Sequence, residues 1–335
     1  MVSLRATRRR TVDRKTLMTE TRSPRFIQSR VADAGPEAAG AALLAARPSV
    51  APKYFYDALG SRLFEAITEL TEYYPTRTEA AIFAARGAEM RAAFGAGSIL
   101  VDLGAGNCAK AVSLFPVLQP KRYVAVDVSA EFLRGALGQV QREHPQLDVV
   151  GLGQDFSAGL ELPADLLEGG APLFFYPGSS IGNFTRDEAF AFLRRIRAHA
   201  AGGGLLIGVD LVKPRPVLEA AYDDALGVTA AFNLNALRHL NAAIGSDFEP
   251  RQWRHVAFYD EAASRIEMHL EARQALVVRW PGAERRFAAG ERIHTENSYK
   301  YTIEGFASLL RDAGFRSPQA WTDVNGWFAV FRAAA

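Results

Sequence analysis

The chain has 335 residues and a formal net charge of +2, and its composition is 49% hydrophobic and 23% charged. These proportions are typical of a globular protein with one large domain or two ordinary ones. The small net charge gives no argument for a nucleic-acid partner, and no apolar run reaches the ~20 residues of a membrane span. One cysteine excludes an intrachain disulfide and fits a reducing compartment. We therefore expect a cytoplasmic protein.

The first 30 residues are strongly basic, with nine Arg or Lys residues against two acidic ones. They show no apolar periodicity, and the apolar segment of a secretory signal does not follow the arginines. We therefore expect residues 1–28 to form a disordered tail. A targeting signal or an anion-binding arm is the alternative interpretation.

Strands and helices are predicted to alternate from about residue 98. The predicted strands are 98–103, 122–127, 147–152, 173–176 and 205–212, and the predicted helices are 108–118, 129–144 and 186–201. Ser129 is the expected N-cap of the second helix, which has an apolar face. This alternation predicts an α/β fold with a doubly wound parallel sheet.

The alternation stops at residues 213–216, a Lys-Pro-Arg-Pro segment that continues neither a helix nor a central strand. The elements predicted after it are a helix over 217–243, antiparallel strands at 265–270 and 274–280, a helix at 303–313 and a last strand at 326–332. Because the last two elements restore the earlier pattern, an insert is predicted to interrupt the sheet.

A glycine-rich turn follows the first predicted strand, where residues 101–107 read Val-Asp-Leu-Gly-Ala-Gly-Asn. Gly104 and Gly106 allow a sharp turn and a close approach of a ligand to the backbone. Asp127 ends the next strand, where a carboxylate can accept both hydroxyls of a ribose. The pattern predicts a nucleotide site at the carboxyl ends of the strands.

Two classes of cofactor fit this turn. The two glycines and Ala109 match G-x-G-x-x-A, which leaves a nicotinamide-dependent oxidoreductase open. Two acids favour S-adenosylmethionine instead, because Asp102 could engage a methionine amino group, and Asp155 with Phe156 could contact an adenine. Either acid could also simply cap a turn or a loop.

Neither a cysteine nucleophile nor a metal centre is predicted. Cys108 has no histidine near it in the sequence, so we interpret it as a small buried helix residue. The six histidines show no metal-ligand spacing.

Three further segments carry a family resemblance. They are residues 53–79, which contain Glu-Tyr-Tyr-Pro-Thr-Arg, residues 175–184, which contain Gly-Ser-Ser-Ile-Gly-Asn, and residues 294–301, which read His-Thr-Glu-Asn-Ser-Tyr-Lys-Tyr. In this order they resemble the histidine-specific Nα-methyltransferase family of ergothioneine biosynthesis, from about residue 50 to the C-terminus. The first two motifs are specific, whereas the glycine-rich turn is not.

The resemblance implies a class I, Rossmann-like methyltransferase core with an inserted α+β substrate-binding domain. The core would comprise residues 78–212 and 300–335, and the substrate-binding domain residues 29–77 and 213–299. The implied reaction transfers three methyl groups from S-adenosylmethionine to the α-amino group of free L-histidine, giving trimethylhistidine (hercynine). A small-molecule substrate and a monomeric enzyme are expected, with no membrane or nucleic-acid partner.

The resemblance also implies roles for individual residues. The positions that hold S-adenosylmethionine are Gly104, Lys110, Asp127, Asp155 and Phe156. The positions that hold histidine are Tyr73, Asn183, Tyr222, Glu296 and Ser298, and Tyr56 falls near the amino group to be methylated. A purely structural role is the alternative for each of them, and Lys300 and Tyr301 are interpreted as structural.

These residue types suit methyl transfer to a free amino acid. The reacting amine must be neutral and aligned with the sulfonium, and a tyrosine hydroxyl can bond to it without holding it charged. Glu296 and Ser298 are two residues apart on an extended segment, so both can reach one end of an imidazole ring. A carboxylate there favours histidine over rings without an N–H. A different aromatic substrate such as tryptophan, and a catalytically silent cofactor-binding protein, are the rival hypotheses.

Overall fold

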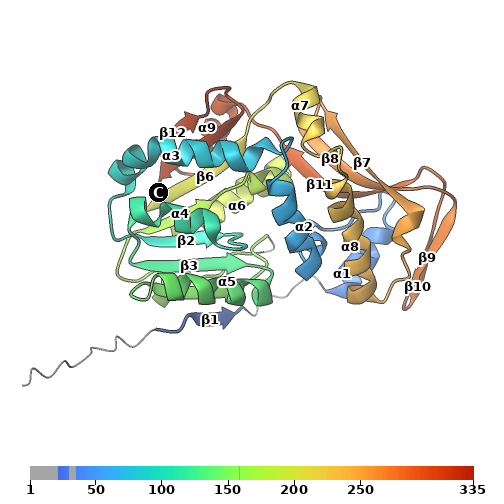
Figure 1. The fold of residues 1–335 in the computed structure, drawn as a ribbon, viewed down its shortest axis with the longest axis horizontal. Coiled ribbons are helices and arrows are strands. Elements are labelled where there is room, and N and C mark those ends of the chain that lie inside the picture. The colour runs from blue at the N-terminus through green and yellow to red at the C-terminus, as the bar shows by residue number, and fades with distance from the viewer. Residues whose placement is uncertain (1–21, 30–34, 158) are drawn as a thin grey trace, which may run out of the picture.

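The computed structural model describes residues 22–29, 35–157 and 159–335. Figure 1 shows two parts side by side, a sheet flanked by helices and a smaller part of helices and antiparallel strands. We call them the core lobe and the second lobe. The predicted α/β fold with an inserted α+β part is confirmed. No helix in the described part of the chain is long and apolar enough to cross a bilayer.

The core lobe is built on an eight-stranded sheet with the order β1-β4-β3-β2-β5-β6-β13-β12. Its strands are β1 (Arg25–Gln28), β2 (Ile99–Leu103), β3 (Arg122–Asp127), β4 (Asp148–Gly153), β5 (Pro172–Tyr176), β6 (Gly204–Asp210), β12 (Arg316–Thr322) and β13 (Phe328–Ala334). The first six in this order pair in parallel, while β13 runs antiparallel to β6 and β12 antiparallel to β13. The central strands are buried along their whole length because helices cover both faces.

Five helices cover this sheet. They are α3 (Tyr74–Phe94), α4 (Ala109–Leu118), α5 (Ala130–Glu143), α6 (Arg186–His199) and α9 (Ile303–Asp312). Residues of α3, α4 and α5 share one hydrophobic cluster with the sheet, and residues of α6 and α9 share another. The two clusters make the sheet doubly wound, as predicted. Each fully buried Leu or Phe in them contributes about 1.5–3 kcal/mol.

The second lobe packs helices against a three-stranded sheet of order β11-β8-β7 and a separate β9–β10 hairpin. Its elements are α1 (Pro36–Leu44), α2 (Ala58–Thr68), α7 (Arg215–Ala220), α8 (Val228–Ile244), β7 (Trp253–Asp260), β8 (Arg265–Ala272), β9 (Leu276–Trp280), β10 (Ala283–Phe287) and β11 (Arg292–Tyr299). Four short 3-10 helices complete the elements of the described residues: η1 (Pro52–Phe55), η2 (Ala164–Leu166), η3 (Ser180–Asn183) and η4 (Pro250–Gln252).

Separate hydrophobic clusters underlie the two lobes. The cluster of the second lobe gathers buried residues from 43–74 and 218–293. The clusters of the core lobe gather buried residues from 82–211 and 299–335. Each lobe is therefore assembled from separate parts of the chain.

Part of the expected disordered tail is ordered, so the prediction for residues 1–28 is wrong for Arg25–Gln28. This segment forms β1 at the edge of the sheet, where Phe26 is the register partner of Gly151 on β4. A Cβ on Gly151 would lie 2.6 Å from the Phe26 ring, so the glycine makes room for it. Residues 1–21 lie outside the described residues.

The prediction of one helix over 217–243 is also wrong. The structure has α7 and α8 there, separated by a loop that ends at Gly227 in the left-handed region (φ +74°). Asp224 explains the break, because its carboxylate accepts hydrogen bonds from the backbone N–H groups of Val228 and Thr229. An acidic side chain that satisfies the first N–H groups of a helix favours a new helix start.

Ser129 precedes α5 as predicted, but its side chain does not cap the helix. Its hydroxyl donates instead to the carbonyl oxygen of Tyr56 at 2.9 Å. Tyr56 belongs to the second lobe, so this bond connects the lobes beside the end of β3.

Candidate active site

The glycine-rich turn presents bare backbone at the carboxyl end of β2. Gly104 and Gly106 both have a backbone in the left-handed region (φ +72° and +52°), which residues with a side chain rarely adopt. A Cβ on Gly106 would meet no atom within 4 Å, and one on Gly104 would lie 3.7 Å from the Phe156 ring. The turn is therefore open to a ligand and adjoins Phe156.

Asp127 lies at the end of β3, where the sequence predicted a ribose acceptor. Its carboxylate accepts backbone N–H bonds from Gly106 and Ser129, each at 2.8 Å. Burial raises the pKa of Asp127, and these N–H groups oppose the rise. A carboxylate can accept about four hydrogen bonds, so Asp127 can also accept ligand hydroxyls beside the open turn.

Asp155 and Phe156 follow β4 and reach the same region. The Asp155 carboxylate accepts from the backbone N–H of Ser157 at 3.1 Å. The Phe156 ring stacks on Phe192 with centroids 5.7 Å apart and meets Tyr176 edge-on at 5.9 Å. This packing fixes Phe156 next to Gly104.

Asp102 precedes the turn on β2, and its contact with a methionine amino group stays a prediction. It is buried, accepts a bond from Tyr123 Oη at 2.7 Å, and has its pKa raised to about 7 by burial. Cys108 is also fully buried, and burial raises the pKa of its thiol to about 12. This confirms that Cys108 is a packing residue.

Lys110 on α4 is held by an acid that the sequence analysis missed. Its Nζ lies 2.7 Å from a carboxylate oxygen of Glu79, which is fully buried on α3. The other Glu79 oxygen accepts the backbone N–H of Gly178 at 2.9 Å. Since Gly178 lines the pocket described next, Glu79 connects the cofactor side of the site with the other side.

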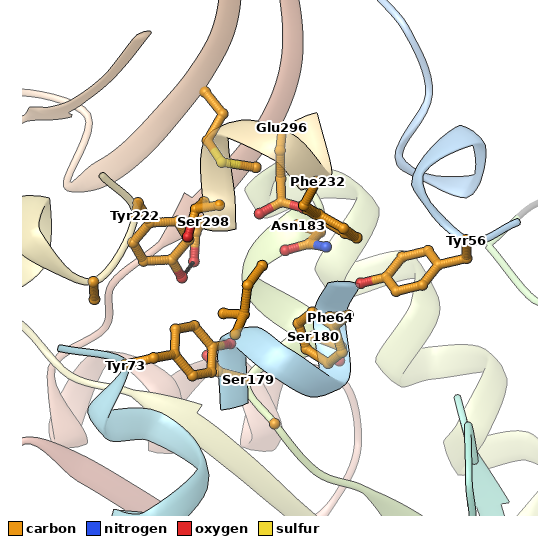
Figure 2. A pocket seen from close by; sticks show the side chains of 15 residues that line it. Tyr56, Phe64, Tyr73, Ser179, Ser180, Asn183, Tyr222, Phe232, Glu296 and Ser298 are labelled. Carbon is orange, nitrogen blue, oxygen red and sulfur yellow. Dashed lines mark hydrogen bonds between the residues drawn. The ribbon is translucent and has the colours of Figure 1, made fainter. Parts of the chain in front are cut away.

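A pocket between the lobes is lined by fifteen residues (Figure 2). Its walls include all the side chains predicted to contact the substrate or the reacting amine: Tyr56, Tyr73, Asn183, Tyr222, Glu296 and Ser298. They come from five separate segments of the chain. Tyr56 follows η1, Tyr73 precedes α3, Asn183 lies in η3, Tyr222 follows α7, and Glu296 and Ser298 lie on β11. The structure thus brings these six residues together.

Aromatic rings form one side of this pocket. Tyr56 lies edge-on to Phe64 of α2 at 5.8 Å and to Phe232 of α8 at 5.7 Å, and Tyr73 lies edge-on to Tyr222 at 6.4 Å. Burial raises the pKa of all three tyrosines well above the usual value, so they stay protonated. Phe64 and Phe232 could not be singled out from the sequence, because apolar rings on helices are typical of any core.

Glu296 is the acidic group of the pocket (Figure 2). It is 8% exposed, and its carboxylate has no hydrogen-bond partner among the described residues. Burial raises its pKa to about 7, against the opposing charge of Lys300. A register shift in β11 lies between His294 and Glu296 and could not be foreseen.

A pair of hydroxyls forms the other polar part of the pocket. Tyr222 Oη and Ser298 Oγ lie 2.7 Å apart. Lys300 Nζ donates to both from behind, at 3.1 and 2.7 Å respectively. The predicted orientation of Glu296 and Ser298 toward the same side is confirmed, since both line the pocket.

Residues 37–335 match the model of a protein family described as histidine-specific methyltransferase, SAM-dependent. The chain belongs to this family. It is 41% identical to histidine N-alpha-methyltransferase of Mycolicibacterium smegmatis, over 87% of this chain and 91% of that one. The enzyme of the same name from Mycobacterium tuberculosis is 40% identical, over 85% and 90% of the two chains. Ergothioneine biosynthesis protein 1 of Neurospora crassa is 32% identical over 81% of this chain, which spans 31% of that protein.

Membership of the histidine-specific methyltransferase family decides between the two interpretations of the turn. The cofactor is S-adenosylmethionine and not a nicotinamide dinucleotide, and the doubly wound core is the class I, Rossmann-like methyltransferase fold. The residues present fit this cofactor, because an open backbone turn, an acceptor at Asp127 and a fixed ring at Phe156 adjoin one another. Within the described ranges, no group of three or more His, Cys, Asp or Glu side chains is placed to hold a metal ion.

Proposed function

We propose that the enzyme methylates the α-amino group of free L-histidine three times in succession, producing trimethylhistidine for ergothioneine biosynthesis. The observation that carries this is the pocket itself. An unpartnered buried carboxylate, Glu296, faces it together with an amide and hydroxyls that suit a free amino acid. Membership of the histidine-specific family supports the same substrate.

The cofactor supplies an electrophilic methyl group on a sulfonium. We propose that it is held by the residues around the turn: Gly104, Lys110, Asp127, Asp155 and Phe156. The bare backbone of the turn permits close approach, and Asp127 offers a charged acceptor to the ribose hydroxyls. Glu79 holds Lys110 in place from the substrate side.

The substrate is proposed to lie with its ring between Glu296 and Ser298 and its carboxylate toward Asn183 and Tyr222. Each of these groups lines the pocket. An ionised Glu296 accepts a ring N–H, and a phenylalanine would leave that acceptor unpaired at a cost of about 1–3 kcal/mol. The hydrogen-bonding groups therefore select histidine.

The tyrosines are proposed to position the reacting amine. Tyr56 would lie nearest to it, with Tyr73 on the neighbouring wall. Because both phenols stay protonated, they carry no charge that would hold the amine as an unreactive ammonium. The rings of Phe64 and Phe232 beside Tyr56 suit a nitrogen that becomes a quaternary cation, since aromatic faces attract such ions.

The deciding experiment is mass spectrometry of the products formed from S-adenosylmethionine and a mixture of all amino acids. Histidine carrying one, two and three added methyl groups is expected, with the trimethylated form accumulating. Methylated tryptophan in its place would refute the substrate. Cofactor binding without any methylated amino acid would favour the catalytically silent alternative.

We further propose that the second lobe, residues 29–77 and 213–299, is the substrate-binding domain, and residues 78–212 and 300–335 the methyltransferase core. The hydrophobic clusters support this division because they change close to these boundaries. A monomer in the cytoplasm stays our prediction, and light scattering of the purified protein tests the oligomeric state.

A further inference from the structure

A buried cluster of charges lies behind the hydroxyl pair of the pocket. The carboxylate of Asp210, at the end of β6, contacts Lys213 Nζ at 2.6 Å and Lys300 Nζ at 2.7 Å, and the three side chains are at most 1% exposed. Tyr74 Oη also donates to Asp210 at 2.7 Å. Burial lowers the pKa of Lys213 to about 8, which leaves it mostly charged at neutral pH. Two ammonium groups thus share one carboxylate, and the cluster has an excess positive charge that solvent does not screen.

Lys300 has no donor left for a ligand. An ammonium group offers three N–H donors and no acceptor. Those of Lys300 go to Asp210, to Ser298 Oγ at 2.7 Å and to Tyr222 Oη at 3.1 Å. Lys300 therefore binds no ligand itself, and it acts on the pocket through the two hydroxyls and through its charge, which opposes the rise in the pKa of Glu296.

The hydroxyl pair has one proton to offer. Tyr222 and Ser298 bring one O–H each, and their mutual bond of 2.7 Å uses one of the two protons. Since Lys300 donates to both oxygens, neither proton is needed to satisfy it. Whichever hydroxyl donates within the pair, the proton of the other is free for a ligand in the pocket that both line. This part of the pocket is therefore a donor with a positive charge behind it.

The nearby acid makes the two polar groups of the pocket complementary. Glu296 lies two residues before Ser298 on β11 and has no partner among the described side chains. A ligand that satisfies both must bring an N–H to Glu296 and an acceptor to the hydroxyl pair. The charge of Lys300 favours an anionic acceptor over a neutral one, because charge-assisted bonds are roughly twice as strong.

We propose that Lys300 is a positioning residue that determines specificity, and that, with Ser298 donating within the pair, it makes the Tyr222 hydroxyl a receptor for the carboxylate of the substrate while Ser298 stays beside the ring. The inference rests on the proposed function, and it extends the role of β11 from recognising the ring to requiring a free amino acid. Lys300 touches neither substrate nor cofactor and acts through Tyr222 and Ser298.

The test uses Lys300→Met, with Lys213→Met as the matched control. Each substitution removes one buried ammonium from the same carboxylate and leaves Asp210 paired with the other lysine and with Tyr74. Only Lys300 bonds to the pocket hydroxyls. Lys300→Gln is a second variant, which keeps a polar side chain and loses the charge.

The measurement is kcat/KM for L-histidine and for L-histidinamide, which has the same ring and amine but a neutral group in place of the carboxylate. Lys300→Met is expected to lower kcat/KM for histidine about 10- to 100-fold, mainly through KM, as the loss of a charge-assisted bond predicts. For the amide we expect a loss below about threefold. Lys213→Met should leave the ratio of kcat/KM for histidine to kcat/KM for the amide at its wild-type value. The ratio in Lys300→Gln should lie between those of the wild type and Lys300→Met.

An equal loss of kcat/KM for histidine and for the amide in Lys300→Met would overturn the proposal. The proposal would also fail if Lys213→Met changed the ratio of the two values as much as Lys300→Met does. Failure of both Lys300 variants to fold would assign the lysine a structural role alone. A wild-type enzyme that methylates an amino acid other than histidine refutes the proposed function and not this inference. The acid and amide of that amino acid then give the same comparison.

Discussion

The cofactor turn and the substrate pocket are built in different ways. The turn uses backbone atoms and side chains at the carboxyl ends of β2, β3 and β4, which neighbour one another in the sheet. The pocket uses side chains from five segments that meet only because the second lobe folds against the core. The turn is therefore fixed by the sheet, whereas the pocket depends on how the two lobes pack.

The two regions also differ in their charges. Asp127 accepts two backbone N–H groups, so hydrogen bonds within its own lobe stabilise the charge of its carboxylate. Glu296 has no such hydrogen-bond partner within the described chain, and its pKa of about 7 reflects burial that the charge of Lys300 offsets only in part. A group left unsatisfied in this way has its partner in the ligand, at a cost to the empty protein.

The largest expected effect comes from Glu296→Ala. Removing the acceptor leaves the ring N–H of histidine unpaired, so kcat/KM for histidine should fall roughly 10- to 1000-fold. Activity on tryptophan should stay equal or rise, because the variant gains room and loses no partner of the indole. Steady-state kinetics with both amino acids measures this. Unchanged histidine kinetics would show that Glu296 does not contact the substrate. A loss of cofactor affinity would show that Glu296 belongs to the cofactor site and not to the substrate pocket.

Asp127→Ala tests the other region. It removes a charged acceptor from the ribose, so affinity for S-adenosylmethionine should fall about 10- to 100-fold. Calorimetry on the folded variant measures the change. Asp148→Ala is the matched control, because Asp148 lies at the start of β4, away from the turn, and pairs with Arg122. Equal affinities in the two variants would contradict the assignment of Asp127.

Glu296→Gln should stabilise the empty enzyme in a pH-dependent way. Burial raises the pKa of this carboxyl from 4.5 to about 7 in the folded protein. The folded state therefore binds the proton more tightly than the unfolded state, and stability falls as the pH rises from about 4.5 to 7. The variant lacks this loss, so it should exceed the wild type by up to about 3 kcal/mol at pH 8 and by little at pH 4.

Melting curves at the two pH values measure this difference. Glu267→Gln is a control of opposite sign, because its bonds to Arg265 and His269 lower the pKa of Glu267. That variant should be less stable than the wild type at pH 8. A melting temperature of Glu296→Gln that does not depend on pH relative to wild type would show that the carboxyl is not desolvated.

The smallest effect is expected from removing β1. A chain lacking residues 1–29 loses the packing of Phe26 and the bond of 3.0 Å between Ser29 and Gln154, next to Asp155. Burial of one partly exposed ring contributes about 1–2 kcal/mol, so the melting temperature should fall by a few degrees. Cofactor affinity should fall a few-fold. A chain lacking only residues 1–21 keeps β1 and is the control. If it shows the same losses of melting temperature and cofactor affinity, these losses come from residues 1–21 and not from β1.

Much of the core lobe could be predicted from the sequence, because its signals are local. The buried strands end in recognisable residues such as Gly104 and Asp127, and alternation with helices fixes the doubly wound sheet. β1 was missed because four residues in a basic segment show no period, and its position depends on Gly151, far away in the chain. Asp224 was not recognised as the residue that starts α8.

The pocket could be predicted only through the family resemblance. No spacing rule connects Tyr56, Asn183 and Glu296, since their meeting depends on the packing of two lobes. The aromatic neighbours Phe64 and Phe232 carried no signal of their own. Lys300 was interpreted as structural because a sequence does not reveal which hydroxyls a buried ammonium contacts.

The chain passes from one lobe to the other four times between its described elements: after β1, before α3, after β6 and after β11. No single cut in the gene separates the lobes. Recombination that exchanges the second lobe between relatives must therefore replace two separate segments of the gene together and preserve every junction with the core lobe. We expect natural and engineered changes of substrate to accumulate as point substitutions around the pocket, because inheriting a whole foreign domain demands several simultaneous crossovers.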